Sequence, residues 1–247
     1  MRGLTGLLAI VIVGCIVSCH SAAIVNHRCS NTVDGMDITC ECYADHFELD
    51  FWNNFENATS IEITGSCKDI SISKLFKSLK SLTVLAQLTQ LSGDDFPDSI
   101  VNLIVRHNKL TFLDVGSFPA GLQFIHASNN LITKVDFESL PAALFFLNLD
   151  RNNIPSLNLD PLEGRKPALS MYVTNNPVFC TCALIRQFAG AVESGGLVCG
   201  IRGGSACFKC RSGGDDRFLN YSMYSEQSKY SKLRVTDAMS AQCLSDR

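Results

Sequence analysis

The fold is decided by two stretches that share one pattern, Leu103-Ile104-Val105-Arg106-His107-Asn108-Lys109-Leu110 and Leu147-Asn148-Leu149-Asp150-Arg151-Asn152-Asn153-Ile154. In each stretch, two apolar residues alternate with other residues, and an asparagine follows before a last apolar position. Alternation with a period of two predicts a short strand whose apolar side chains point into a core. The asparagine can satisfy backbone groups in the turn, which would otherwise be buried without partners.

The same apolar pair recurs along the chain. The pairs are Ile61/Ile63, Leu82/Val84, Leu103/Val105, Phe124/His126, Leu147/Leu149 and Met171/Val173. The first four are spaced by 21 residues, and the others follow after steps of 23 and 24. In each of the last four pairs, an asparagine follows the first residue by five positions. We expect these asparagines to form a ladder along the solenoid: Asn108, Asn129, Asn152 and Asn176. Such repetition predicts a solenoid of stacked coils.

This pattern resembles that of the leucine-rich-repeat family over about residues 58–180. The resemblance implies an α/β solenoid, a curved right-handed coil with a parallel β-sheet on its concave face and disulfide caps at both ends. About six repeat strands and little regular helix are expected, because prolines punctuate the segments between the strands. An all-β sandwich is the competing interpretation, and the regular step argues against it.

The N-terminal stretch has the features of a secretory signal peptide. Arg2 is basic, Leu7 to Val17 is almost continuously apolar, and small residues offer a cleavage site after Ala23. A transmembrane anchor is the alternative, but the apolar run is short for a hydrocarbon core of ~30 Å. Loss of residues 1–23 would leave ten of the twelve cysteines. An even number suits disulfides in an oxidising compartment.

The chain is therefore expected to have four parts: a signal peptide at 1–23, an N-terminal cysteine-rich cap at 24–57 completed by Cys67, repeats at 58–175, and a C-terminal cysteine-rich cap and tail at 176–247. Sequons at Asn57 and Asn220 predict glycosylation and agree with secretion. A formal net charge of −3 is too weak to indicate a nucleic-acid or membrane-surface partner.

The N-terminal cysteines are Cys29, Cys40, Cys42 and Cys67, and they resemble the N-terminal cap of the family with wider gaps. The pairing usual in the family would give Cys29–Cys42 and Cys40–Cys67. Cys67 also occupies an apolar repeat position, so a buried free thiol is the alternative there.

The run Asn176–Cys182 matches the start of the C-terminal cap of extracellular members of the family, and a short helix with Phe188 as its apolar plug is expected to follow. The resemblance implies the pairs Cys180–Cys207 and Cys182–Cys243, with Cys199–Cys210 as an extra bridge. Cys207 and Cys210 could exchange roles. A zinc site formed by Cys180, Cys182, Cys207 and Cys210 is the alternative, which an oxidising compartment disfavours.

Side chains that alternate with the inward pairs are expected on the concave face. The predicted ligand-binding residues are Leu85, Ile104, Arg106, Ile125, Phe146, Asn148, Asp150 and Tyr172. Their apolar members would form an exposed stripe, and such patches with aromatic and arginine side chains are typical of partner sites. Cover by the C-terminal tail, self-association and an ordinary apolar surface are the alternatives.

Catalytic signatures are missing from the sequence, including the common zinc-protease, hydrolase and nucleotide-binding motifs. His126 replaces an inward leucine and is expected to be a hydrogen-bonded core residue, while His107 lies in a turn. The pair Asp94-Asp95 is expected in a solvated turn, with calcium binding a minor alternative. We therefore expect no enzyme, no cofactor and no metal site.

These features predict a secreted, extracellular, non-catalytic recognition protein. It would bind an extracellular protein or glycan ligand through its concave face, in host defence, adhesion or developmental signalling. A homodimer is compatible with the sequence, and neither a nucleic-acid partner nor a membrane span is expected. The alternative is an auxiliary or inhibitory non-catalytic subunit of a secreted enzyme.

Overall fold

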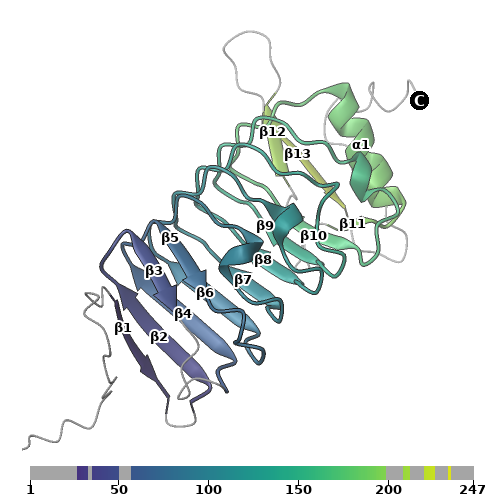
Figure 1. Cartoon of the computed structure of the whole chain (residues 1–247). Coiled ribbons are helices and arrows are strands. Elements are labelled where there is room, and N and C mark those ends of the chain that lie inside the picture. Colours follow the sequence, from purple (N-terminus) through teal and green to yellow (C-terminus); the bar gives the residue numbers. More distant parts are fainter. Residues whose placement is uncertain are drawn as a thin grey trace, which may run out of the picture.

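The computed structural model describes residues 27–32, 35–49 and 57–198, and the backbone of three further strands at 208–211, 220–225 and 233–234. Within these residues, the main element is a nine-stranded sheet in the order β1-β2-β4-β6-β7-β8-β9-β10-β11 (Figure 1). Its neighbouring strands are parallel, except for the antiparallel pair β1–β2 at one edge. The predicted solenoid of the leucine-rich-repeat type is confirmed.

The strands of this sheet are β1 (His27–Asn31), β2 (Asp37–Cys42), β4 (Ser60–Gly65), β6 (Ser81–Leu85), β7 (Asn102–Ile104), β8 (Phe124–His126), β9 (Phe146–Asn148), β10 (Leu169–Tyr172) and β11 (Leu197–Val198). Six of the described strands, β4 and β6 to β10, carry the repeat, as predicted. Inward side chains form one continuous core, in which each coil buries its apolar residues against its neighbours. Both ends of such a stack need cover.

Strand β8 has a register one residue later than the 21-residue step predicts. Ile125 is in register with the buried leucines of both neighbouring strands, and Ile125 and Ala127 are fully buried. Phe124 and His126 instead lie half-buried on the outer face. The predicted inward pair and the predicted exposure of Ile125 are therefore wrong. Ile125 and Ala127 fill the core without the cost of burying an imidazole.

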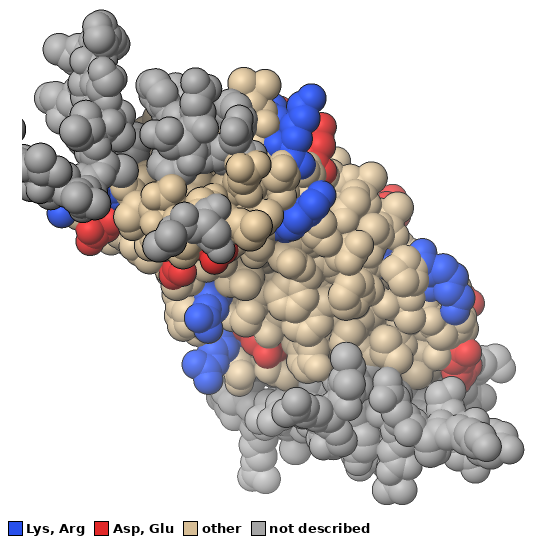
Figure 2. Space-filling view, turned by 90° about the horizontal axis from the view of Figure 1, so that it is seen from below, with Lys and Arg blue, Asp and Glu red and all other residues tan. Residues whose placement is uncertain are grey.

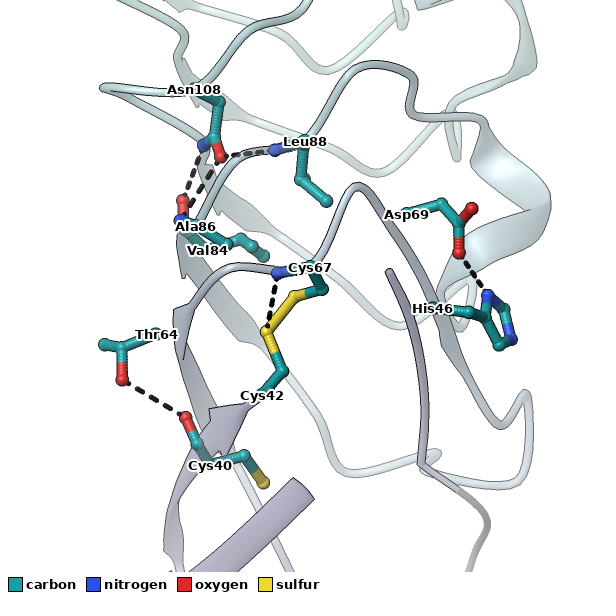
Figure 3. The surroundings of a disulfide bond; sticks show 10 residues. All are labelled: Cys40, Cys42, His46, Thr64, Cys67, Asp69, Val84, Ala86, Leu88 and Asn108. Carbon is teal, nitrogen blue, oxygen red and sulfur yellow. Dashed lines mark hydrogen bonds and ion pairs between the residues drawn. A yellow bond between two sulfur atoms is a disulfide. The ribbon is translucent and has the colours of Figure 1, made fainter. Parts of the chain in front are cut away.

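The asparagine ladder consists of Asn108, Asn130, Asn152 and Asn176, each at most 7% exposed. Each Oδ1 accepts a backbone N–H of the preceding coil at 3.0–3.1 Å, from Leu88, Leu110, Ile132 and Ile154 respectively. Figure 3 shows Asn108 reaching the preceding coil in this way. The predicted rung Asn129 is wrong: it is the turn residue before the rung, with φ of 55°.

The N-terminal cap is closed by two disulfides whose pairing differs from the prediction. They are Cys29–Cys40 and Cys42–Cys67, with Cα–Cα distances of 4.1 and 5.8 Å. Figure 3 shows the second of them. The antiparallel register of β1 and β2 places Cys29 directly opposite Cys40. Cys42 lies next to the following coil, where the backbone N–H of Cys67 donates to its Sγ at 3.1 Å. Local strand pairing therefore decides the connectivity.

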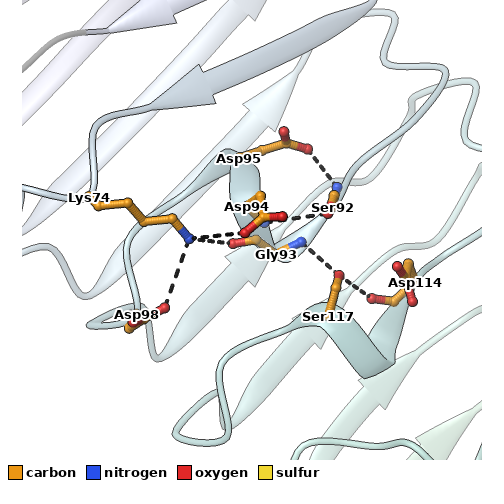
Figure 4. A network of polar contacts seen from close by, with 8 residues as sticks. All are labelled: Lys74, Ser92, Gly93, Asp94, Asp95, Asp98, Asp114 and Ser117. Atoms are coloured by element: carbon orange, nitrogen blue, oxygen red, sulfur yellow. Dashed lines mark hydrogen bonds and ion pairs between the residues drawn. The ribbon is translucent and has the colours of Figure 1, made fainter.

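Opposite the main sheet, β3 (His46–Leu49) and β5 (Asp69–Ile72) form a small parallel sheet. Further along this side are the 3₁₀ turns η1 (Gly93–Asp95), η2 (Val115–Ser117) and η3 (Asp160–Leu162). In η1, Asp95 accepts from the Ser92 backbone N–H, and the Lys74 Nζ lies 3.9 Å from a carboxylate oxygen of Asp94 (Figure 4). Asp95 thus caps the turn, and Asp94 forms an ion pair with Lys74.

Neighbouring turns on this side are in close contact. The Gly93 backbone N–H donates to Ser117 Oγ at 2.7 Å (Figure 4). A Cβ at Gly93 would lie 1.7 Å from the Ser117 carbonyl oxygen, so this position requires glycine.

Within the predicted C-terminal cap lies the helix α1 (Cys182–Glu193), whose first turn is capped by the Thr181 side chain. Phe188 is fully buried against the last coil, in the position expected for an apolar plug. Cys180 and Cys182 are both disulfide-bonded. The predicted signal peptide and the predicted bridging partners Cys199, Cys207 and Cys243 lie outside the described residues. For Cys210 and Asn220 the backbone is described but the side chain is not. The strands β12 (Phe208–Arg211), β13 (Asn220–Ser225) and β14 (Leu233–Arg234) form a separate sheet.

Candidate functional site on the open face of the sheet

The open face of the sheet carries the outward side chains of the parallel strands. The register places them in three rows that cross the strands. The row at the start of the strands reads Ser60, Ser81, Asn102, Phe124, Phe146 and Ser170. The middle row reads Glu62, Thr83, Ile104, His126, Asn148 and Tyr172. The third row, just at or past the strand ends, reads Thr64, Leu85, Arg106, Ser128, Asp150 and Thr174.

Three aromatic rings gather on β8, β9 and β10, and we call them, together with His126, the aromatic cluster. The rings of Phe124 and Phe146 are stacked, with centroids 4.2 Å apart and planes 5° from parallel. Tyr172 follows at 5.6 Å from Phe146. The His126 ring lies edge-on to Phe124 at 6.4 Å. Strands in parallel register bring equivalent positions to about 4.8 Å, which suits stacked rings.

Hydrogen bonds fix the polar side chains beside the cluster. Oδ1 of Asp150 accepts from the backbone N–H and the hydroxyl of Thr174, at 2.6 and 2.8 Å. Oδ1 of Asn148 accepts the backbone N–H of Asp150 at 2.9 Å. Arg106, in contrast, is exposed just past the end of β7, the strand next to β8. The site therefore offers a rigid apolar centre with one carboxylate and one guanidinium beside it.

The pKa of His126 lies below the ordinary value for histidine. Burial is the main cause, because it disfavours the charged imidazole, and the positive charge of Arg106 acts in the same direction. Asp150 opposes both effects, and His107 adds to the lowering. The lowered pKa favours the neutral form of the His126 imidazole within the cluster.

A serine–histidine contact occurs on this face, and its surroundings differ from those of a hydrolytic centre. His126 Nε2 lies 2.9 Å from the Ser128 hydroxyl, a distance that suits a nucleophile and its base. However, Ser128 is 6% exposed, which leaves little room for a substrate to reach its hydroxyl. The nearby backbone N–H groups of Ala127 and Asn129 donate to the carbonyls of Asn148 and Asp150, so neither is free to stabilise an oxyanion. We interpret the contact as one that orients the imidazole.

Seven of the eight predicted face residues lie on the open face, and Ile125 does not. The prediction missed Phe124 and His126, which complete the cluster. A signal for them was present in the sequence: Pro97, Pro119 and Pro141 are spaced by 22 residues, and each precedes an inward residue by six positions. That spacing places Ile125, and not Phe124, in the core.

Charged side chains are sparse on the molecular face shown in Figure 2. Uncharged residues cover most of the described surface there, and basic and acidic residues lie in small separate groups. Within the described part of the chain, no three His, Cys, Asp or Glu residues are arranged to hold a metal ion. In the same part, no helix is long and apolar enough to cross a membrane.

Comparison with known proteins gives similarity to solved structures alone. Neither a family model nor a curated protein sequence matches the chain. The structure is similar to YopM from Yersinia enterocolitica WA-314, with 21% identity and a TM-score of 0.41, over 67% of this chain and 36% of that one. It is also similar to human 5T4 (Wnt-activated inhibitory factor 1, trophoblast glycoprotein), with 17% identity and a TM-score of 0.46, over 77% of this chain and 92% of that one.

Proposed function

We propose that this chain is a secreted, non-catalytic recognition protein that binds a protein partner through the open face of its sheet. The observation that carries the proposal is the aromatic cluster on β8 to β10. The rings of this cluster are half-buried on a rigid support, so they lose little conformational freedom on binding, and aromatic and arginine side chains dominate interface energies. Arg106 and Asp150 beside the cluster can give orientation and specificity.

The stacking geometry favours a protein partner over a glycan. Sugars bind aromatic side chains by placing C–H groups on an exposed ring face. Phe124 and Phe146 cover each other's faces at 4.2 Å, and the other side of Phe146 is directed to Tyr172. The two stacked faces are thereby closed to a sugar, whereas the ring edges, which carry partial positive charge, can contact a partner. Apolar side chains and backbone carbonyl groups of a protein suit such edges.

Secretion is supported by the N-terminal cap, where two disulfides lie within one small region. Stable disulfides form in oxidising compartments. Asn57 of the sequon is exposed in the turn before β4, where a glycan would be tolerated. These features agree with the leader expected at residues 1–23.

The test compares three forms of the secreted protein in affinity capture from extracellular fluid of the source, followed by mass spectrometry. Phe146→Ser removes the centre of the cluster, and serine already occupies equivalent positions of the row. Leu131→Ser removes an apolar side chain that is 45% exposed and lies after the strands, so it is the matched control. We expect a partner that the wild type and Leu131→Ser retain and Phe146→Ser loses, by about 2 kcal/mol or roughly 30-fold in Kd with the purified pair.

Identical sets of captured proteins for all three forms would contradict the proposal. If the partner lost with Phe146→Ser is a secreted enzyme bound at fixed stoichiometry, the chain is an auxiliary subunit of that enzyme. Binding of free glycans that is abolished by Phe146→Ser would show that the geometric argument against sugars is wrong.

A further inference from the structure

The open face changes in character from one end of the sheet to the other. The aromatic cluster occupies β8 to β10, whereas the outward positions of β2 and β4 include the exposed carboxylates of Asp37, Glu41 and Glu62. Ser81 and Thr83 on β6, and Asn102 and Ile104 on β7, lie on the strands between. An apolar end and an acidic end are thus carried by one continuous surface.

The three carboxylates are not equally available to a partner. Glu41 accepts a hydrogen bond from the Tyr43 hydroxyl and lies opposite Arg28 on β1. Asp37 and Glu62 are exposed on adjacent strands, and neither forms an ion pair within the described residues. The register pairs Asp37 with Ser60, two residues before Glu62. Their Cα atoms are therefore about 8 Å apart, which lets both side chains attract one basic side chain.

Strand spacing sets the distance between the two ends. Glu62 on β4 and Phe124 on β8 are separated by three steps in the sheet. At about 4.8 Å per step, this is about 14 Å along the row direction. An extended peptide advances about 3.3 Å per residue, so about four residues cover the distance. A segment that crosses the strands could therefore contact both ends at once.

Arg106 limits where a basic side chain of the partner can lie. It is exposed on the β7 coil, one step from Phe124 and two steps from Glu62. A lysine or arginine on the β7 side of the apolar anchor would face this guanidinium and be repelled. A basic side chain placed over Glu62 and Asp37 is attracted there and lies beyond Arg106.

We propose that the partner presents an extended segment across the strands, with an apolar side chain on the aromatic cluster and a lysine or arginine about four residues away, over Glu62 and Asp37. This inference rests on the proposed function and specifies the chemistry of the partner. Charge complementarity fixes the register of the segment, and the aromatic cluster supplies most of the affinity.

The test uses a phage library of random twelve-residue peptides, selected on the wild-type secreted protein. The selected peptides are then titrated against Phe146→Ser, Glu62→Lys and the control Glu48→Lys. Glu48 is an exposed carboxylate on β3, on the other side of the solenoid. Selected peptides should carry an apolar residue and a basic residue about four positions apart. Glu62→Lys should weaken them at least about fivefold, and Glu48→Lys should not.

Salt provides a second readout, since raising it from about 0.05 to 0.5 M should weaken binding to the wild type more than to Glu62→Lys. Peptides that depend on Phe146 but bind Glu62→Lys unchanged would overturn this inference and leave the proposed function standing. Peptides insensitive to Phe146→Ser, or no enrichment at all, would overturn both. A wild type that sediments as a dimer, with Phe146→Ser monomeric, would show that a second copy occupies the face and would also overturn the inference.

Discussion

Replacing Asn130 and Asn129 one at a time tests the register of β8 directly. Oδ1 of Asn130 accepts the Leu110 N–H at 3.1 Å, and Nδ2 donates to the carbonyls of Val105, Ala127 and Ser128 at 2.9, 3.1 and 3.4 Å. Each of these carbonyls keeps another donor in Asn130→Ala, respectively Asn108 Nδ2, Asn152 Nδ2 and the His107 N–H. The Leu110 N–H is left buried without a partner.

The magnitude follows from that count. One orphaned buried donor costs about 1–3 kcal/mol, and the weakened bonding of three carbonyls adds about 1 kcal/mol. We therefore expect Asn130→Ala to lower the free energy of unfolding by about 3 kcal/mol. Asn129 has φ of 55° and one weak side-chain contact, 3.5 Å to Ser128 Oγ. Asn129→Ala should cost about 1 kcal/mol because alanine is strained there, and Asn129→Gly close to nothing.

Urea unfolding of the oxidised protein, followed by far-UV circular dichroism, measures these differences. With a typical urea m-value of about 2 kcal/mol per M, Asn130→Ala should shift the midpoint down by about 1.5 M at unchanged m. Glycine separates the two positions further, since Asn130→Gly should be at least as damaging as Asn130→Ala. A larger loss for Asn129→Ala than for Asn130→Ala would refute the register, and with it the placement of Phe124 and His126 on the open face.

Three further predictions concern the core, the cluster and the cap. Ile125→Ala should cost about 2–5 kcal/mol in the same unfolding assay because it leaves a cavity, whereas His126→Ala should cost less than half as much; equal costs would contradict the burial pattern. Since the pKa of His126 is lowered in the folded state, the unfolded chain binds more protons, and stability should fall as the pH drops below about 6.5. His126→Gln should flatten that part of the stability–pH curve, and an unchanged curve would rule out this contribution. Cleavage of the denatured, non-reduced protein after Glu41 should leave the sequences on either side unlinked to each other, because Cys29 pairs with Cys40 and Cys42 with Cys67; mass spectrometry that finds residues 29–41 disulfide-linked to residues 42–67 would show the crossed pairing.

The sequence predicted the solenoid well because its periodicity is a direct consequence of the sheet register. The sequence-based prediction failed at β8 because three repeat positions there can each be assigned to either of two adjacent residues. Phe124-Ile125, Asn129-Asn130 and Leu131-Ile132 each offer two similar residues to one repeat position. Packing decides between them, since the alternative register would bury His126 in place of Ala127. A spacing rule that treats each strand alone does not include that cost.

The cap and the candidate site show a second limit of sequence reasoning. The family pairing of the N-terminal cysteines ignores that an antiparallel β1 brings Cys29 opposite Cys40. The aromatic cluster likewise depends on side chains from three coils that come together through the register of β8, β9 and β10. Seven face residues could be placed from alternation, but the stacking of Phe124 on Phe146 required the corrected register.

The asparagine ladder gives the solenoid a direction. Each rung protects an amide in the coil before it, so the effect of losing a rung is displaced: Asn152→Ala should speed hydrogen exchange at Ile132, 20 residues earlier. When a coil lacks its own asparagine, the amide that loses its hydrogen-bond acceptor therefore belongs to the coil before it. Gln87 is exposed at its rung position, yet the Leu88 amide is held by Asn108 from the next coil. One coil earlier, the Cys67 amide donates to Cys42 Sγ, which belongs to the preceding coil. At the N-terminal end, the acceptor for the equivalent amide is therefore a disulfide sulfur and not an amide oxygen.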